Sequence, residues 1–163
     1  MAHKHFVIEW LSDAHGMENA LVQVLENHAK DAEGHPQQPR IQEHIVTTRR
    51  HADTVKECIQ RFGGDTSTLK TGMANIFGTL QGMSSGAAED ELVKNAISDY
   101  AAEQFEVASY KALIAAAEEL ADQETLRACQ ENLREDEEMA RWLEQQLPMV
   151  AQEFLRSKTR ANS

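Results

Sequence analysis

Apolar residues recur at helical spacing in four long segments of the chain, and polar or Gly- and Pro-containing stretches separate the segments. The pattern predicts helices over about residues 6–32, 39–62, 89–120 and 123–147. Gly34, Pro36 and Pro39 break the pattern between the first two helices, and Asp122 can cap the fourth. The sequence therefore predicts an all-α protein with a single domain over residues 1–163.

A long Gly-, Ser- and Thr-rich connection, residues 66–88, follows the second predicted helix. Residues 73–80 within it predict a short helix, because their apolar side chains share one face. A connection of this length can cross the bundle. Pro148 is expected to start or kink a short C-terminal helix in the tail, residues 148–163. The predicted architecture is an antiparallel four-helix bundle with one long crossover and a short C-terminal helix.

Composition supports this fold and narrows the possible partners. Only 8 Gly and 3 Pro occur in 163 residues, as suits a helical protein. The net charge of −11 argues against nucleic acid or an anionic membrane as a partner. The chain has no spanning apolar run and no signal-peptide pattern, so we expect a cytoplasmic protein. Cys58 and Cys129 lie singly on apolar stripes, which predicts buried free thiols.

Acidic and imidazole side chains interrupt the apolar stripes in all four predicted helices. They are Glu18, His44, His51, Glu103, Glu106 and Asp136. A carboxylate on a buried face is costly unless a positive charge pairs with it. Carboxylates can bridge and balance two divalent cations, and imidazole completes the coordination of iron or manganese. These six residues are the predicted ligands of a dinuclear iron or manganese centre.

The spacing leaves alternatives open for several of these residues. His44 and His51 are two helical turns apart, so one imidazole could be level with the metal while the other is not. Glu106 could lie at the wet boundary of its helix. Asp136 belongs to the acidic run 135–138, which could be a solvated face or could present another of its acids to the centre. The Glu-x-x-His pairs typical of dimetal bundles are absent from the second and fourth helices.

Short motifs around these residues carry a family resemblance. They are Leu11-Ser-Asp-Ala-His-Gly-Met-Glu18-Asn-Ala-Leu21, Glu43-His44-Ile-Val-Thr-Thr48, Glu103-Gln-Phe-Glu106-Val-Ala-Ser-Tyr110 and Leu133-Arg-Glu135-Asp136. From about Phe6 to Leu147 the chain resembles the YciE/YciF family of ferritin-like stress proteins, and the third motif is the most specific. The resemblance implies a rubrerythrin-like four-helix bundle with a dinuclear metal site, often in a dimer.

The chain departs from the family pattern at four positions. The family usually has Glu where Thr47 stands, Asp where Ala140 stands and His where Gln104 stands. His51 stands where Gln is common and adds a possible nitrogen ligand. Two carboxylates fewer and one imidazole more are expected to leave less negative charge to hold two cations.

Two functions fit these observations. The first is a ferritin-like protein that binds a di-iron or di-manganese centre and supports oxygen or peroxide chemistry, in oxidative or general stress. The second is a non-catalytic structural or stress protein with a degenerate, metal-free centre. In that case Glu103 and Glu106 would pair with His44 and His51 as a polar network. No nucleophile–base pair or nucleotide fingerprint points to another reaction.

Two further features bear on function without deciding it. Tyr110 lies one turn beyond Glu106 and could donate a hydrogen bond to a ligand, act as a redox-active phenol or simply pack in the core. Phe154 and Leu155 in the tail could form a homodimer contact or a face for another partner. The expected partners are metal ions and a second copy of the chain.

Overall fold

The computed structural model describes residues 3–65, 78 and 88–161. Its long helices are α1 (Lys4–Asp31), α2 (Gln38–Arg61), α4 (Glu91–Glu119) and α5 (Gln123–Ala161). The described residues contain no strand, so the predicted all-α bundle is confirmed. The short helix predicted at 73–80 falls almost wholly outside the described residues, since only residue 78 of that stretch is among them.

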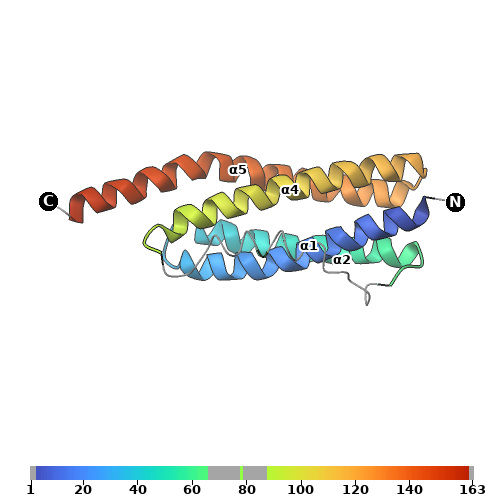
Figure 1. Ribbon diagram of the computed structural model, residues 1–163, viewed down its shortest axis with the longest axis horizontal. Helices are drawn as coiled ribbons and strands as arrows, with labels where there is room; N and C mark the ends of the chain where they lie inside the picture. The colour runs from blue at the N-terminus through green and yellow to red at the C-terminus, as the bar shows by residue number, and fades with distance from the viewer. Residues whose placement is uncertain (1–2, 66–77, 79–87, 162–163) are drawn as a thin grey trace.

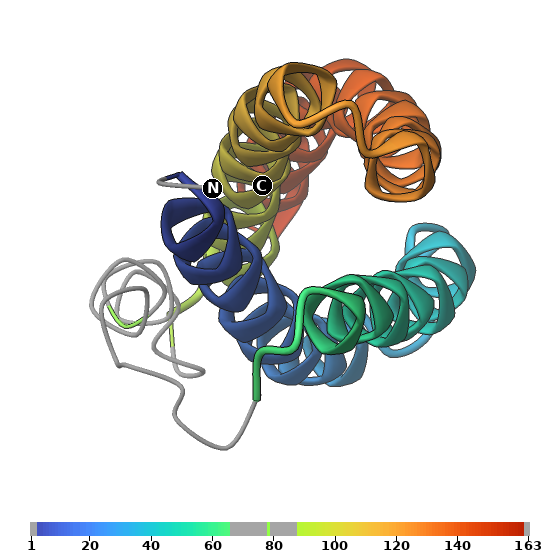
Figure 2. The ribbon, with the colours of Figure 1, turned by 90° about the vertical axis from the view of Figure 1, so that its right-hand side faces the viewer.

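The helices form two hairpins, α1–α2 and α4–α5, that pack side by side (Figure 2). Across the hairpins α1 lies against α4 and α2 against α5. In Figure 1, α1 and α5 run in one direction along the long axis and α2 and α4 in the other, so neighbouring helices are antiparallel. Helix α2 ends at the end of the bundle opposite to the start of α4, and most of the predicted crossover between them lies outside the described residues.

Local sequence explains where the helices begin and end. Gly34 and Gly63 follow α1 and α2 with φ of +76° and +77°, a conformation in which a side chain would be strained. Pro39 stands in the first turn of α2, where its missing N–H costs nothing. Asp122 Oδ1 accepts hydrogen bonds from the backbone N–H groups of Glu124 and Thr125, at 3.2 and 3.3 Å, and so caps α5 as predicted.

The prediction of a separate C-terminal helix is wrong. Helix α5 is 39 residues long in all and continues through Pro148 to Ala161. Proline inside a helix costs about 3 kcal/mol relative to Ala, so other contacts must offset it. Val150 beyond the proline is buried, and Phe154 lines a common hollow with Leu92 of α4. Lys158 Nζ lies 2.9 Å from the Glu89 carboxylate, which adds an ion pair at the same end of the bundle.

Apolar side chains from all four helices fill the interior. The largest that are almost fully buried include Leu11, Met17, Leu21, Leu25, Ile59 and Leu113. Burial of one such side chain contributes about 1.5–3 kcal/mol relative to exposure, so this core is the main source of stability. Cys58 and Cys129 are buried and free, as predicted.

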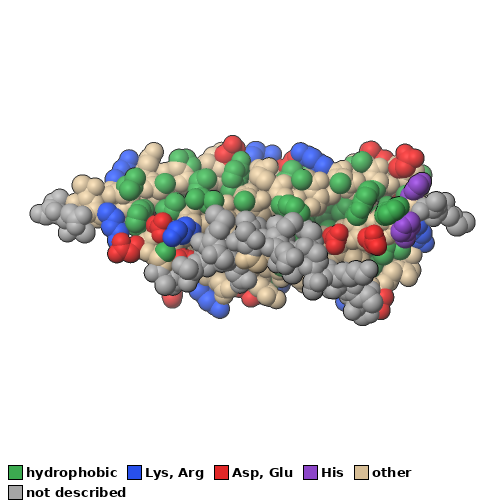
Figure 3. Space-filling view, in the orientation of Figure 1, with side chains coloured by type: hydrophobic (Ala, Val, Ile, Leu, Met, Phe, Trp, Pro, Cys, Tyr) green, Lys and Arg blue, Asp and Glu red, His purple; other side chains and the backbone are tan. Residues whose placement is uncertain are grey.

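The surface is mixed in character. Hydrophobic side chains gather along α4 on the face drawn in Figure 3, and Ile97 of that helix is 40% exposed. Charged side chains lie among them and towards both ends. Over the described ranges, no helix has both the length and the apolarity needed to cross a membrane.

Candidate metal centre

Side chains from all four helices meet in the middle of the bundle. They are the six predicted ligands, Glu18, His44, His51, Glu103, Glu106 and Asp136, which we call the central cluster. None is more than 4% exposed. Helical geometry explains the convergence, because residues three or seven apart share a face. The six acids and imidazoles predicted from the sequence therefore lie together and are buried in the structure.

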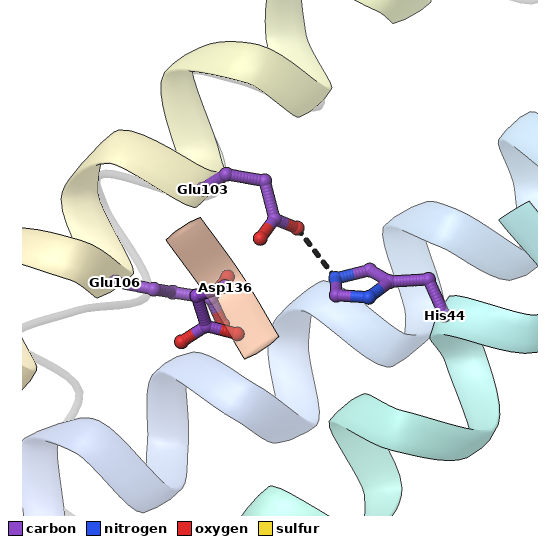
Figure 4. A group of neighbouring side chains, drawn as sticks. All are labelled: His44, Glu103, Glu106 and Asp136. Carbon is purple, nitrogen blue, oxygen red and sulfur yellow. Dashed lines mark hydrogen bonds and ion pairs between the residues drawn. The ribbon is translucent and has the colours of Figure 1, made fainter. Parts of the chain in front are cut away.

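The first part of the cluster joins α2, α4 and α5. One potential ligand atom from each of His44, Glu103, Glu106 and Asp136 lies within 4.8 Å of the others. Figure 4 shows Glu103 and Glu106 projecting from α4 towards His44 on α2, with the Asp136 carboxylate beside Glu106. His44 Nε2 lies 2.6 Å from Glu103 Oε1, which is a hydrogen bond. Three carboxylates and one imidazole thus surround one small space.

The second part adds α1. Glu18, His51 and Asp136 also place one ligand atom each within 4.8 Å of one another. His51 Nδ1 lies 3.6 Å from Glu18 Oε1 and 3.3 Å from Asp136 Oδ1. Asp136 belongs to both parts, so the two groups are adjacent. Each histidine joins one of them, and neither His44 nor His51 is off the level of the cluster.

The acidic run on α5 divides between the interior and the surface. Asp136 faces the cluster and is 1% exposed, so it is not part of a solvated face. Glu135 is 22% exposed and touches His51 from the other side, since its Oε2 lies 2.7 Å from His51 Nε2. Glu138 is 61% exposed and lies 3.5 Å from Arg40. Glu106, for which a boundary position was considered, is fully buried.

Most polar atoms of the cluster have no hydrogen-bond partner. They are Glu18 Oε2, Glu103 Oε2, both oxygens of Glu106, both oxygens of Asp136 and His51 Nδ1. Buried polar groups in proteins are nearly always paired, because an unpaired one loses its hydration without compensation. Six carboxylate oxygens and one nitrogen without a hydrogen bond therefore lie together, although His51 Nδ1 and Asp136 Oδ1 are close enough for an ion pair. Such a donor set could hold metal ions.

The crowding of acids changes their protonation. Burial, together with the Glu18 charge, raises the pKa values of Glu103 and Glu106 well above the ordinary range. Burial also raises the pKa of Asp136 to about 7, although His51 opposes this shift. Without a cation, these carboxyl groups therefore tend to keep their protons.

The two imidazoles respond in opposite directions. Burial lowers the pKa of His44, which stays neutral at pH 7. Burial alone would also lower the pKa of His51, but the Asp136 and Glu18 carboxylates outweigh it and raise the value to about 11. A protonated His51 thus supplies positive charge that a metal ion would otherwise supply.

The charge of the cluster suits two divalent ions. Four carboxylates balance two divalent cations when both histidines are neutral, and four carboxylates with two imidazoles are also the donors of ferritin-like dimetal sites. Here Glu103 and Glu106 both come from α4 and both histidines from α2. The ligands are therefore distributed over the helices differently from the usual dimetal bundle, in which two helices each supply a Glu-x-x-His pair. Although Thr47 and Ala140 stand where the family has carboxylates, the four carboxylates of the cluster can neutralise two divalent cations.

Sequence reasoning missed contacts that depend on how the helices are aligned. Glu135 was not assigned to His51, although its position beside Asp136 was the available signal. A second buried pair joins α1 to α4, where His28 Nδ1 lies 2.6 Å from Asp99 Oδ1. Asp99 is four residues before Glu103, a spacing that could have pointed to it. Tyr110 is buried in the core and donates a hydrogen bond to Glu18.

Fold and cluster together define the protein as a four-helix bundle with a buried carboxylate–imidazole centre. The chain belongs to the family described as a domain of unknown function, DUF892, whose model matches residues 1–156. A protein from Xanthomonas campestris pv. campestris has a similar crystal structure, with a TM-score of 0.82 and 27% identity over 98% of this chain and 99% of the other. YcfI from Rhodopseudomonas palustris, provisionally described as a structural protein, shares the fold with a TM-score of 0.76 and 18% identity, over 85% of this chain and 90% of its own.

Proposed function

We propose that this protein is a ferritin-like protein whose central cluster binds two iron or manganese ions. The observation that carries the proposal is the set of unpaired, fully buried carboxylate oxygens in two adjacent groups that share Asp136. Such a set is costly in a metal-free protein and is satisfied when cations bind.

The donors favour iron or manganese over softer metals. Carboxylate and imidazole suit these ions, whereas thiolates would favour zinc or copper(I). The cluster has no thiol among its ligand atoms, and the pKa of Cys129 is raised to about 12 by burial, which keeps it protonated. We assign His44, Glu103 and Glu106 to one ion, Glu18 and His51 to the other, and Asp136 to both.

His51 has the geometry of a metal-binding histidine. Its Nε2 hydrogen-bonds to Glu135 on the outer side, while its Nδ1 faces Glu18 and Asp136 at ion-pair distance without a hydrogen bond. Histidines that bind metals usually give their other ring N–H to a carboxylate, which fixes the tautomer and orients the ring. Ion binding at Nδ1 would displace the proton held there.

The centre would support oxygen or peroxide chemistry when its ions are bound. The chain itself would keep water away, because every ligand residue is buried, and would hold Glu18 in place through the Tyr110 hydroxyl. The resemblance to YciE/YciF stress proteins supports a role in oxidative or general stress. It also supports a cytoplasmic homodimer, for which Leu155, 65% exposed, is an available contact.

The alternative is a structural protein with a metal-free centre. The hydrogen bond between His44 and Glu103 favours it, because an imidazole and a protonated carboxyl group can satisfy each other without a cation. Both oxygens of Glu106 remain unpaired, however, and His51 pairs with Glu135 and not with Glu106. The network expected for a metal-free centre is therefore incomplete.

Metal reconstitution tests the proposal. Protein stripped with a chelator, then loaded anaerobically with Fe(II) or Mn(II) and desalted, should retain about two ions per chain by mass spectrometry. The double variant Glu103→Gln with Glu106→Gln should retain fewer than one. Because the raised pKa values keep these groups neutral without metal, Gln should replace them without unfolding the bundle.

A matched control separates ligand loss from a general change of charge. Glu118→Gln with Glu119→Gln removes two charges from the exposed end of the same helix and should leave the metal content at the wild-type value. Wild-type protein that retains well below one ion per chain would overturn the proposal in favour of the metal-free alternative.

A further inference from the structure

Several ion pairs line the contact of α2 with α5 and with Asp122, the residue that caps α5. The ion pairs are Arg40 with Glu138, Arg50 with Glu131 and Glu135, and Arg61 with Asp122 and Glu124. We call this contact the α2–α5 seam. Exposed ion pairs contribute little to stability, so the seam can open locally at a lower cost than the apolar contacts within each hairpin.

The central cluster reaches the surface through this seam. Within the described chain, the hydrogen bond of His44 ends on the buried Glu103, and the contacts of Glu18 lead to the buried Tyr110 and Asn132. His51 differs, because its Nε2 lies 2.7 Å from Glu135 Oε2.

Glu135 in turn belongs to the surface. It is 22% exposed, and its Oε2 lies 2.6 Å from an Arg50 guanidinium nitrogen. Arg50 is 47% exposed and also lies 3.7 Å from Glu131. His51 therefore stands between this exposed pair and the carboxylates of Glu18 and Asp136, with one ring nitrogen towards each side.

We infer that divalent cations enter and leave the central cluster through the α2–α5 seam at Glu135, with Arg50 as the clasp that closes it. The inference rests on the proposed metal centre. A hydrated cation must exchange waters for protein oxygens in steps, and Glu135, within the described residues, is a carboxylate both open to water and in contact with a cluster residue. Arg50 neutralises that carboxylate while the clasp is closed, so a cation must displace the guanidinium to bind there.

The inference is tested by the rate of Co(II) binding to metal-free protein, followed by the visible absorption of the bound ion in a stopped-flow instrument. Arg50→Gln removes the clasp and should speed both binding and release by about tenfold, with the dissociation constant changed less than threefold. Glu135→Gln removes the charge that attracts the ion and should slow binding about tenfold.

Arg61→Gln is the matched control, because it removes ion pairs of the same seam at Asp122 and Glu124, away from His51. It should bind Co(II) at the wild-type rate. Equal rates for wild type, Arg50→Gln and Glu135→Gln would overturn the inference, as would an acceleration that Arg61→Gln reproduces. Wild-type protein that binds no Co(II) at equilibrium would instead overturn the metal centre itself, and the access route with it.

Discussion

Tyr110 and Asn132 position a candidate ligand without belonging to the central cluster. The Tyr110 hydroxyl donates to Glu18 Oε1 at 2.5 Å and accepts from Asn132 Nδ2 at 2.9 Å. Burial and the nearby Glu18 charge raise the pKa of Tyr110, so the phenol remains a hydrogen-bond donor at neutral pH. Glu18 is thereby held at one oxygen, while Oε2 stays unpaired within the cluster.

Tyr110→Phe should destabilise the protein because it leaves Glu18 Oε1 and the Asn132 amide buried without their shared partner. We expect the free energy of unfolding to fall by about 1–3 kcal/mol, measured by urea denaturation. Tyr100→Phe, which removes a hydroxyl from a half-buried side chain of the same helix, should change it by less than about 0.5 kcal/mol. Equal losses in the two variants would show that the hydrogen bonds at Tyr110 add nothing specific.

The residues of the cluster were predictable to the extent that they interrupt apolar stripes. Glu18, Glu103 and Asp136 each stand where the helical period predicts a buried side chain. Asp99 was not among the predicted residues, yet it is 2% exposed while the adjacent Tyr100 is half-buried. Its partner His28 lies on another helix, and the sequence does not specify how two helices align along their axes.

In helix α5, tertiary packing overrides the local sequence signal that predicted an end before Pro148. Its prediction ended at 147 because Pro148 lacks an N–H and clashes with the preceding turn. Three other helix predictions lie within two residues of the observed ends, and Gly34 and Gly63 follow two of these helices with positive φ. Beyond Pro148, Val150 is buried and lines a hollow together with Phe154 and Leu92 of α4, and a local sequence pattern does not reveal such tertiary packing.

Pro148→Ala should stabilise the protein if α5 is continuous. Ala restores the backbone hydrogen bond and removes the ring clash, so we expect a gain of about 1–3 kcal/mol in the free energy of unfolding. Denaturation in urea would measure it, with Met149→Ala at the exposed neighbour as the control. A loss of stability on Pro148→Ala would mean that the helix is interrupted in solution and that the proline is favourable there.

Across the whole molecule, the buried charge is unbalanced. Four carboxylates lie in the central cluster, and among the described residues no Lys or Arg side chain is buried. Protons on the acids and on His51 are therefore what offsets the charge when metal is absent. The stability of the metal-free protein should for this reason depend on pH in a direction opposite to that of ordinary surface ion pairs.

The direction in which stability changes with pH follows from the direction of each pKa shift. Asp136 has a folded-state pKa of about 7, above its ordinary 3.8, so its stabilising contribution is complete below about pH 4 and is lost as pH rises through 7. Glu103 and Glu106 are shifted in the same direction, and so is His51, whose contribution is lost between 6.5 and about 11. His44 is shifted the other way, but above pH 7 it is neutral in both states and adds no slope.

Chelated protein should therefore melt at a lower temperature at pH 9 than at pH 7. Its free energy of unfolding should fall by about 1 kcal/mol per pH unit for each group that keeps its proton in the folded state and loses it on unfolding, as His51 does in this range. Protein loaded with Mn(II) should not show this loss, because metal ions replace the protons and bind more tightly as the ligands deprotonate. Glu103→Gln should flatten the slope of the chelated protein, since it removes one titrating group and keeps the neutral form. Differential scanning calorimetry with and without Mn(II) at both pH values measures all three effects. A chelated protein that becomes more stable from pH 7 to 9 would show that the folded state does not hold these extra protons, and the cluster would then not need metal ions to replace them.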